Sequence, residues 1–397
     1  MATPLEATDL PICHAVESPD DAGPVQSDGW TDTYRTSFRS LEVMQKEAIV
    51  GHSGSGTTWR VASDEGDYLD GADEAPPPLG YMLAGMASDY AGRILALADE
   101  RGLAVDDATV VLDNRYGMEG SVLRGTMTAS AEAPVLHVDL ETDAPDAAVA
   151  DLVDGAVHVS PVTGLLAESL PSQFTLSVND DPVEPDRVEA LDGPAVADPA
   201  AAFEGASPDD APEDPPLVRH TGELTEPLAE ADDRYTERGD STLSDEHDRV
   251  VHLRGICSER EDGTLHVRQK TYSPRASIFE FVADGPRAAG TGVAAPDPLS
   301  YLSAGIGFCF LTQMGRYASV VDRPLAAYRV VQDTRFAPGA VDSEPGRAAP
   351  VDSHVFLETP EGEAFGREVL DMSEQSCYLH ALCRSSLEPA VTVAGSA

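Results

Sequence analysis

Positive charge is what this sequence has least of. Its 397 residues contain 26 lysines and arginines against 70 aspartates and glutamates, a formal net charge of −44, and only Lys46 and Lys270 are lysines. Proteins that bind nucleic acid or anionic membranes contact phosphate through clustered lysines and arginines, so this composition argues against both partners. The acidic residues are spread along the whole chain, which predicts a surface adapted to high salt and a halophilic source.

Long apolar runs are also missing. The longest uncharged run, 298–315, contains several small or polar residues, which suits a buried helix better than a membrane span. Residues 1–20 lack a basic region followed by an apolar core, so no secretory signal is expected and a cytoplasmic location is predicted.

Cysteine is scarce and odd in number. In a reducing compartment, five cysteines at irregular spacing argue against a structural disulfide framework. They are Cys13, Cys257, Cys309, Cys377 and Cys383.

Two parts of the chain resemble each other. Residues 78–90 and 298–310 share Pro-Leu, a tyrosine, Ala-Gly and a closing aromatic in the same register. Further matching blocks occur in the same order at similar offsets, which is typical of a tandem duplication. These blocks are 42–46 with 266–270, 57–64 with 277–284, and 157–165 with 374–382.

The composition divides the chain into four parts. Segments rich in proline, aspartate and alanine predict a disordered tail at 1–29 and an acidic linker at 183–247, because they cannot bury enough apolar surface. The two expected domains are 30–182 and 248–395. In each, β-branched runs such as 31–50 predict antiparallel strands. Proline-initiated helices are expected at 78–101 and 298–320, and the layout is α+β.

Only the second repeat has cysteines at the matched helix positions. Cys309 falls opposite Asp89, and Cys377 falls opposite Ser160. Ser160 precedes a proline and is a good N-cap, so Cys377 is expected near the start of a helix, where the helix dipole favours a thiolate. Two thiols can reduce a peroxide when one attacks the O–O bond and the second closes a disulfide.

The residues around both cysteines resemble a known family. Residues 298–310, with a cysteine and an aromatic late in an Ala/Gly-rich helix, and 376–381 resemble the osmotically inducible protein C and organic hydroperoxide resistance (OsmC/Ohr) superfamily. The resemblance implies two tandem OsmC-like domains that form an intramolecular pseudo-dimer with one degenerate site. It also implies a thiol peroxidase for oxidative stress defence, which reduces organic hydroperoxides with a dithiol reductant and no cofactor. Cys309 would be the peroxidatic cysteine and Cys377 the resolving one.

The sequence departs from the family in two places. Leu299 stands where better-known members have a glutamate, and no single arginine matches the family residue that stabilises the thiolate. Arg275, Arg268 and Arg60 are the candidates for that role. A non-catalytic OsmC-like protein, with a binding or structural role and vestigial cysteines, therefore remains an alternative.

A zinc-thiolate site is the other alternative. Cys377, His380 and Cys383 are spaced three apart on one expected helix, and Cys309 could supply a fourth ligand. Three ligands on one straight helix rarely converge on a tetrahedron, so no metal is expected. His380 is then a helix-surface or core residue, and Cys257 and Cys383 have no assigned role.

Overall fold

The structure is a computed structural model. It describes residues 3–394 except 9, 18–28, 43, 55–56, 195, 207–214, 226–245, 289, 291–294 and 342. Two sheets and the helices that pack on them form the α+β fold that the sequence predicts.

The elements have the following bounds. The helices are α1 (Pro4–Thr8), α2 (Pro78–Arg101), α3 (Asp146–Val159), α4 (Pro161–Ala167), α5 (Ala200–Gly205), α6 (Pro298–Val320), α7 (Glu363–Ser376) and α8 (Tyr378–Arg384), with a 3-10 turn η1 (Asp67–Leu69). The strands before residue 200 are β1 (Cys13–Val16), β2 (Asp32–Ser40), β3 (Lys46–His52), β4 (Thr58–Ser63), β5 (Asp107–Ser121), β6 (Thr128–Ala131), β7 (Val135–Glu141), β8 (Gln173–Val178), β9 (Asp181–Val183) and β10 (Glu189–Ala190). The later strands are β11 (Val218–Glu223), β12 (Glu246–Glu259), β13 (Leu265–Ser273), β14 (Arg275–Ala283), β15 (Ala327–Ala337), β16 (Arg347–Ala348), β17 (Asp352–Glu358) and β18 (Ala390–Val393).

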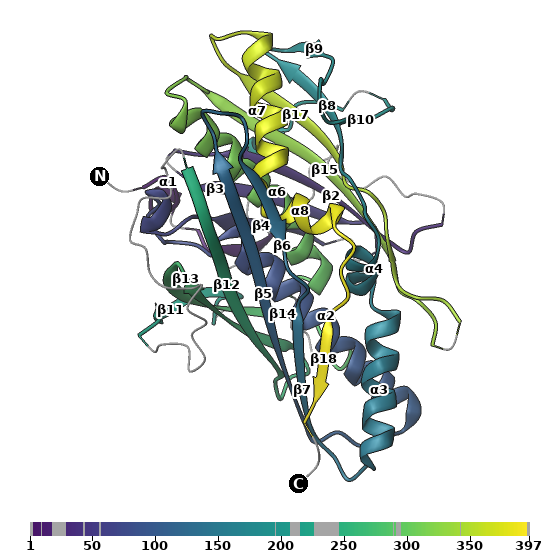
Figure 1. The fold of residues 1–397 in the computed structure, drawn as a ribbon. Helices are drawn as coiled ribbons and strands as arrows, with labels where there is room; N and C mark the ends of the chain where they lie inside the picture. The colour runs from purple at the N-terminus through teal and green to yellow at the C-terminus, as the bar shows by residue number, and fades with distance from the viewer. Residues whose placement is uncertain are drawn as a thin grey trace.

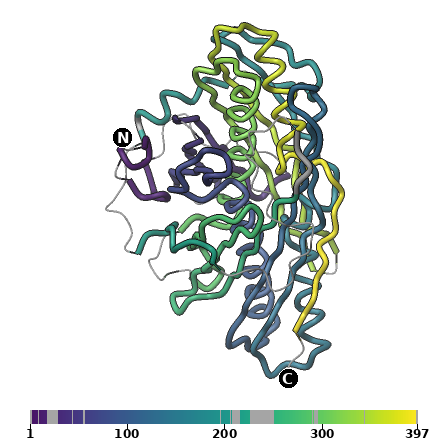
Figure 2. The backbone as a smooth tube through the Cα atoms, turned by 60° about the vertical axis from the view of Figure 1, so that its left-hand side comes forward, coloured from purple at the N-terminus to yellow at the C-terminus, as the bar shows by residue number. Residues whose placement is uncertain are grey.

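Each sheet combines strands from both halves of the chain. The first sheet has the order β1-β4-β3-β2-β15-β17-β8-β10, and the second has the order β11-β14-β13-β12-β5-β7-β18. Strands from the two halves meet at the antiparallel pairs β2 with β15 and β12 with β5. The two strand orders correspond position by position. The run β1-β4-β3-β2 in the first sheet has the same order as β11-β14-β13-β12 in the second. Figure 2 shows the C-terminal strand, in yellow, running beside a strand of the N-terminal half, in agreement with the pairing of β18 with β7.

The two long helices fill the space between the sheets. α6 packs on the first sheet, α2 packs on the second, and the two helices pack on each other near the centre of the molecule (Figure 1). Their bounds agree with the predicted 78–101 and 298–320. Glycine permits the close crossing. A Cβ atom at Gly85 would lie 2.6 Å from the Pro298 carbonyl oxygen, and one at Gly305 would lie 2.7 Å from the Met82 nitrogen.

Shorter helices lie around this centre. α3 and α7 lie at opposite ends of the view in Figure 1, and each is followed by a short helix, α4 or α8. Among the described residues no single helix is long and apolar enough to cross a membrane, although α3 and α4 together, which meet at a 68° bend, pass the same criteria.

The strand pairing corrects one of the matched sequence blocks. Lys46 lies opposite Ser63 in the first sheet, whereas Leu265 lies opposite Ala283 in the second. Because Ser63 and Ala283 occupy matched positions, the counterpart of Lys46 is Leu265, not Lys270. The difference of five residues matters, because an odd shift along a strand places a side chain on the other face of the sheet.

Several described elements lie in the segments for which the sequence predicts a disordered tail and an acidic linker: α1 and β1 in the first, and β10, α5 and β11 in the second. β1 pairs with β4, and β11 pairs with β14, so each extends the edge of a sheet. Val16 and Val218 are 2% exposed. Such short apolar runs within acidic, proline-rich sequence leave little compositional signal, and they become ordered by pairing with an open strand edge.

Candidate active site

Cys309 and Cys377 lie together where α6 meets α8. Cys377 is the N-cap of α8, and its Sγ accepts a hydrogen bond from the His380 backbone nitrogen at 3.5 Å, which confirms the expected helix start. The Cys377 side chain is within hydrogen-bonding range of the Cys309 thiol. Both cysteines are buried, and neither forms a disulfide. The structure therefore brings the two predicted site residues together as reduced thiols.

Burial dominates the acidity of Cys309. Desolvation raises the pKa of its thiol well above the ordinary value, and the neighbouring Cys377 raises it further, while the Leu379 backbone amide donates a hydrogen bond that lowers it. Cys309 therefore rests as a protonated thiol. A thiolate at this position needs a nearby positive charge to offset the loss of water.

A buried lysine lies within electrostatic range of Cys309. Lys46 on β3 is 1% exposed, its Nζ donates to the Met44 carbonyl oxygen at 2.6 Å, and it lies 3.7 Å from Glu65 Oε1. Desolvation lowers the Lys46 pKa, and the negative charges of Glu65, Asp64 and the Cys309 thiolate act to raise it again. Lys46 was not among the residues selected from the sequence. The available signal was its rarity, since it is one of two lysines in an acidic chain.

Glu65 connects this lysine to the cysteine helix. The Thr312 hydroxyl, on the α6 turn after Cys309, donates to Glu65 Oε1 at 2.7 Å, and the Tyr68 hydroxyl donates to Oε2 at 3.0 Å. Glu65 is 5% exposed. The carboxylate is therefore held in position by groups on α6, η1 and β3.

A small cavity opens beside Cys309. It has a volume of about 30 Å³, enough for roughly two water molecules at ~10–15 Å³ each. Its walls come from both halves of the chain and are mainly apolar. They are Glu65, Tyr68, Leu69, Pro77, Pro78, Leu79, Val251, Leu253, Thr271, Pro274, Cys309, Thr312, Gln313 and Tyr378.

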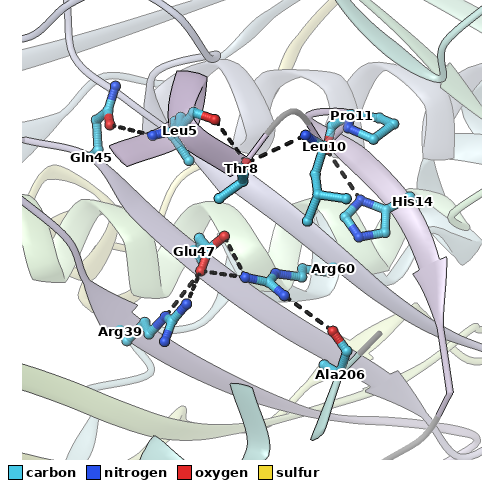
Figure 3. Close-up of polar contacts among 10 residues, drawn as sticks. All are labelled: Leu5, Thr8, Leu10, Pro11, His14, Arg39, Gln45, Glu47, Arg60 and Ala206. Atoms are coloured by element: carbon cyan, nitrogen blue, oxygen red, sulfur yellow. Dashed lines mark hydrogen bonds and ion pairs between the residues drawn. The ribbon is translucent and has the colours of Figure 1, made fainter. Parts of the chain in front are cut away.

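The three arginines selected from the sequence lie elsewhere. The Arg60 guanidinium on β4 donates to the Glu47 carboxylate at 2.7 and 2.8 Å and to the Ala206 carbonyl oxygen at 3.1 Å (Figure 3). Arg268 on β13 and Arg275 on β14 are exposed. None of the three lines the Cys309 cavity.

The matched position in the N-terminal half has no thiol. The Ser160 hydroxyl donates to Asp89 Oδ2 at 2.5 Å, so these two residues meet as Cys377 and Cys309 do. Arg93 forms an ion pair with Asp89 at 3.2 Å. Leu265 takes the place of Lys46, and hence this second position lacks both the nucleophile and the buried cation.

The remaining cysteines and His380 are buried. Desolvation raises the pKa of Cys383 to about 12, with a further contribution from Cys377. His380 packs against Phe310 and Phe174, with ring centroids 4.7 and 5.6 Å away, and burial lowers its pKa to about 3. Within the described ranges, no group of three or more histidine, cysteine, aspartate or glutamate side chains is arranged to hold a metal ion.

No family model and no curated protein matches this chain. Among solved structures, it is similar to an OsmC-like hydroperoxide resistance protein from Jannaschia sp. CCS1. The two chains are 19% identical over 38% of this chain and 97% of the other, with a TM-score of 0.25.

Proposed function

We propose that this protein is a thiol-dependent peroxidase of the OsmC/Ohr type, with Cys309 as the nucleophile and Cys377 as the resolving cysteine. One observation carries the proposal: two free cysteines are in contact beside a buried lysine and a small cavity. A disulfide between them requires only a local rearrangement, because the thiols already lie next to each other.

The architecture fits a fused pseudo-dimer. The matched strand orders, the crossing of α2 with α6, and the pairing of Asp89 with Ser160 all support two OsmC-like repeats within one chain. In this reading the N-terminal repeat has lost its own reaction centre. The N-terminal repeat still contributes to the reaction centre of the other repeat, because β3 supplies Lys46 and the segment after β4 supplies Glu65.

The reaction consumes one hydroperoxide for each disulfide. The Cys309 sulfur attacks the terminal peroxide oxygen, the O–O bond breaks, and the thiol proton ends on the alkoxide that leaves as an alcohol. The Cys377 sulfur then attacks the sulfenic acid of Cys309 and water leaves as the disulfide forms. A dithiol reductant restores both thiols by exchange and is itself oxidised to a disulfide.

Lys46 takes the role of the missing arginine, and Glu65 pairs with Lys46, although the charge of Glu65 itself raises the Cys309 pKa. The lysine ammonium favours the Cys309 thiolate by charge, and Glu65 holds that ammonium in place. The apolar walls of the cavity favour an organic hydroperoxide with a small alkyl group. The proposed reductant is a dithiol. The proposed location is a cytoplasm at high salt.

The test is stoichiometric oxidation of the full chain. Reduced protein at high salt is mixed with one equivalent of tert-butyl hydroperoxide, and intact mass and free thiols are measured. We expect the loss of two hydrogens and of two of the five thiols. Cys309→Ser should stop the reaction. Cys377→Ser should stop at a sulfenic acid that dimedone traps.

Cys257→Ser is the matched control, because Cys257 is buried but lies on β12 and does not line the cavity. It should oxidise as the unchanged protein does. If hydroperoxide leaves all five thiols intact, the peroxidase proposal fails and a non-catalytic role for this fold takes its place.

A further inference from the structure

A second cavity lies away from the cysteine pair, on the other face of the first sheet. Its volume is about 350 Å³, which falls within the roughly 300–1,000 Å³ range of small-molecule sites. The cavity beside Asp89 is smaller, at about 240 Å³. Glu47 lines the larger cavity and directly follows Lys46 on β3, so the two side chains point to opposite faces of the strand.

His14 presents an unpaired nitrogen at this cavity. The residue is 8% exposed, and its Nδ1 lies 3.1 Å from the Pro11 carbonyl oxygen. A carbonyl can only accept, so Nδ1 carries the ring proton. Burial lowers the His14 pKa and keeps the ring neutral, which leaves a lone pair on Nε2. No described residue donates a hydrogen bond to it, and Figure 3 shows this nitrogen on the side of the ring that faces Arg60.

Arg60 presents an unpaired donor to the same cavity. Its terminal nitrogens are occupied by Glu47 and Ala206, but its Nε–H has no acceptor among the described residues (Figure 3). Leaving a buried polar group unpaired is unfavourable, so a ligand that pairs with it is stabilised. A ligand hydroxyl group has the chemistry that both atoms lack, because it can donate to His14 Nε2 and can accept from Arg60 Nε.

The other walls select against charged anions. Glu6, Asp73 and Glu74 line the cavity, and the charge of Arg60 is already paired with Glu47. Carboxylates accept hydrogen bonds from hydroxyl groups and repel phosphate or carboxylate ligands. Leu10 and Ile12 add apolar surface that suits the C–H faces of a sugar ring.

We propose that this cavity binds a small neutral polyhydroxylated molecule, such as a monosaccharide or a sugar alcohol. The cavity size, the donor and acceptor left unpaired at His14 and Arg60, and the surrounding carboxylates all match this chemistry. The inference is independent of the cysteine chemistry, which takes place on the opposite face of β3.

The test is direct binding to the full chain. Glucose, sorbitol and myo-inositol are titrated by calorimetry and by saturation-transfer NMR at high salt, with choline as a cationic comparison. At least one polyol should bind saturably with a 1:1 stoichiometry. His14→Leu should weaken that binding at least tenfold, as expected for the loss of one buried hydrogen bond.

Two further variants keep the test decisive. Glu74→Gln removes one wall charge without changing shape and should weaken polyol binding, so it replaces His14→Leu if circular dichroism shows that the latter is unfolded. His137→Leu, at an exposed histidine on β7, should bind as the unchanged protein does. Binding of no polyol, binding of choline alone, or polyol binding that survives both cavity variants would overturn the proposal.

Discussion

At the scale of single residues, the proposed cysteine site includes a lysine that is costly to bury. Removing an ion from water costs several kcal/mol unless partners compensate. Lys46 has such partners in Glu65 and, when Cys309 is ionised, in its thiolate. One of the two lysines of this chain is thus buried, and the proposed role in thiolate formation accounts for its burial.

Lys46→Met should therefore slow the reaction of Cys309 with hydroperoxide at least tenfold near neutral pH. Without the ammonium charge the Cys309 pKa rises, and each unit of that rise lowers the thiolate fraction about tenfold. The measurement is the rate of disulfide formation against pH, whose rising limb should move to higher pH in the variant.

The matched control is Lys270→Met, which changes the other lysine, a half-buried residue on β13. Its rate and its pH profile should equal those of the unchanged protein. If Lys46→Met leaves the rising limb where it was, Lys46 is structural and does not act on the thiol.

The sequence could identify the cysteine pair but not its surroundings. Cys309 and Cys377 stand out because Asp89 and Ser160 occupy the matched positions in the N-terminal half. Lys46 and Glu65 come from the N-terminal half and are far from the cysteines in sequence, so no local pattern indicates that they lie within electrostatic range of Cys309. Arg60 was a plausible substitute by charge alone, but it sits on the opposite face of the sheet, where Glu47 already pairs with it.

At the scale of elements, the helices were easier to predict than the strands. Proline marks the first turn of α2 and α6, and Gly102 ends α2 with a positive φ of 66°, so local chemistry sets these bounds. The run 31–50 instead divides into β2 and β3. Strand pairing between the halves depends on contacts far apart in the sequence, which no local pattern encodes.

The crossing of α2 and α6 makes a prediction about glycine. Gly305→Ala should destabilise the protein by about 1–3 kcal/mol, because the new methyl group would meet the backbone of α2 and force the helices apart. That loss should exceed the gain of about 1 kcal/mol that alanine brings to a helix. Chemical unfolding at constant salt measures the difference.

Gly92→Ala is the control on the same helix pair. A Cβ atom there would lie 3.4 Å from Leu265, an ordinary contact, so this variant should be neutral or slightly more stable. Equal stability of the two variants would mean that the close crossing contributes nothing to packing.

At the scale of the whole molecule, the two halves complete each other. β5 pairs with β12 over thirteen residue pairs from Glu246 with Ser121 to Ser258 with Thr109, and β2 pairs with β15 in the other sheet. A half that is separated from its partner exposes the edges of two sheets and the apolar face of its long helix. Exposed strand edges and apolar faces of this kind drive association.

Residues 246–397 expressed alone should therefore aggregate or pair with a second copy, rather than remain a folded monomer. Coexpressed with residues 1–225, the same fragment should form a soluble 1:1 complex, because both sheets can then be completed. Size-exclusion chromatography with light scattering distinguishes these states. The complex should also regain disulfide formation with hydroperoxide, since Lys46 and Glu65 return to Cys309. A monomeric, folded C-terminal fragment that reacts as fast as the full chain would show that the N-terminal half is dispensable for both the fold and the thiol chemistry.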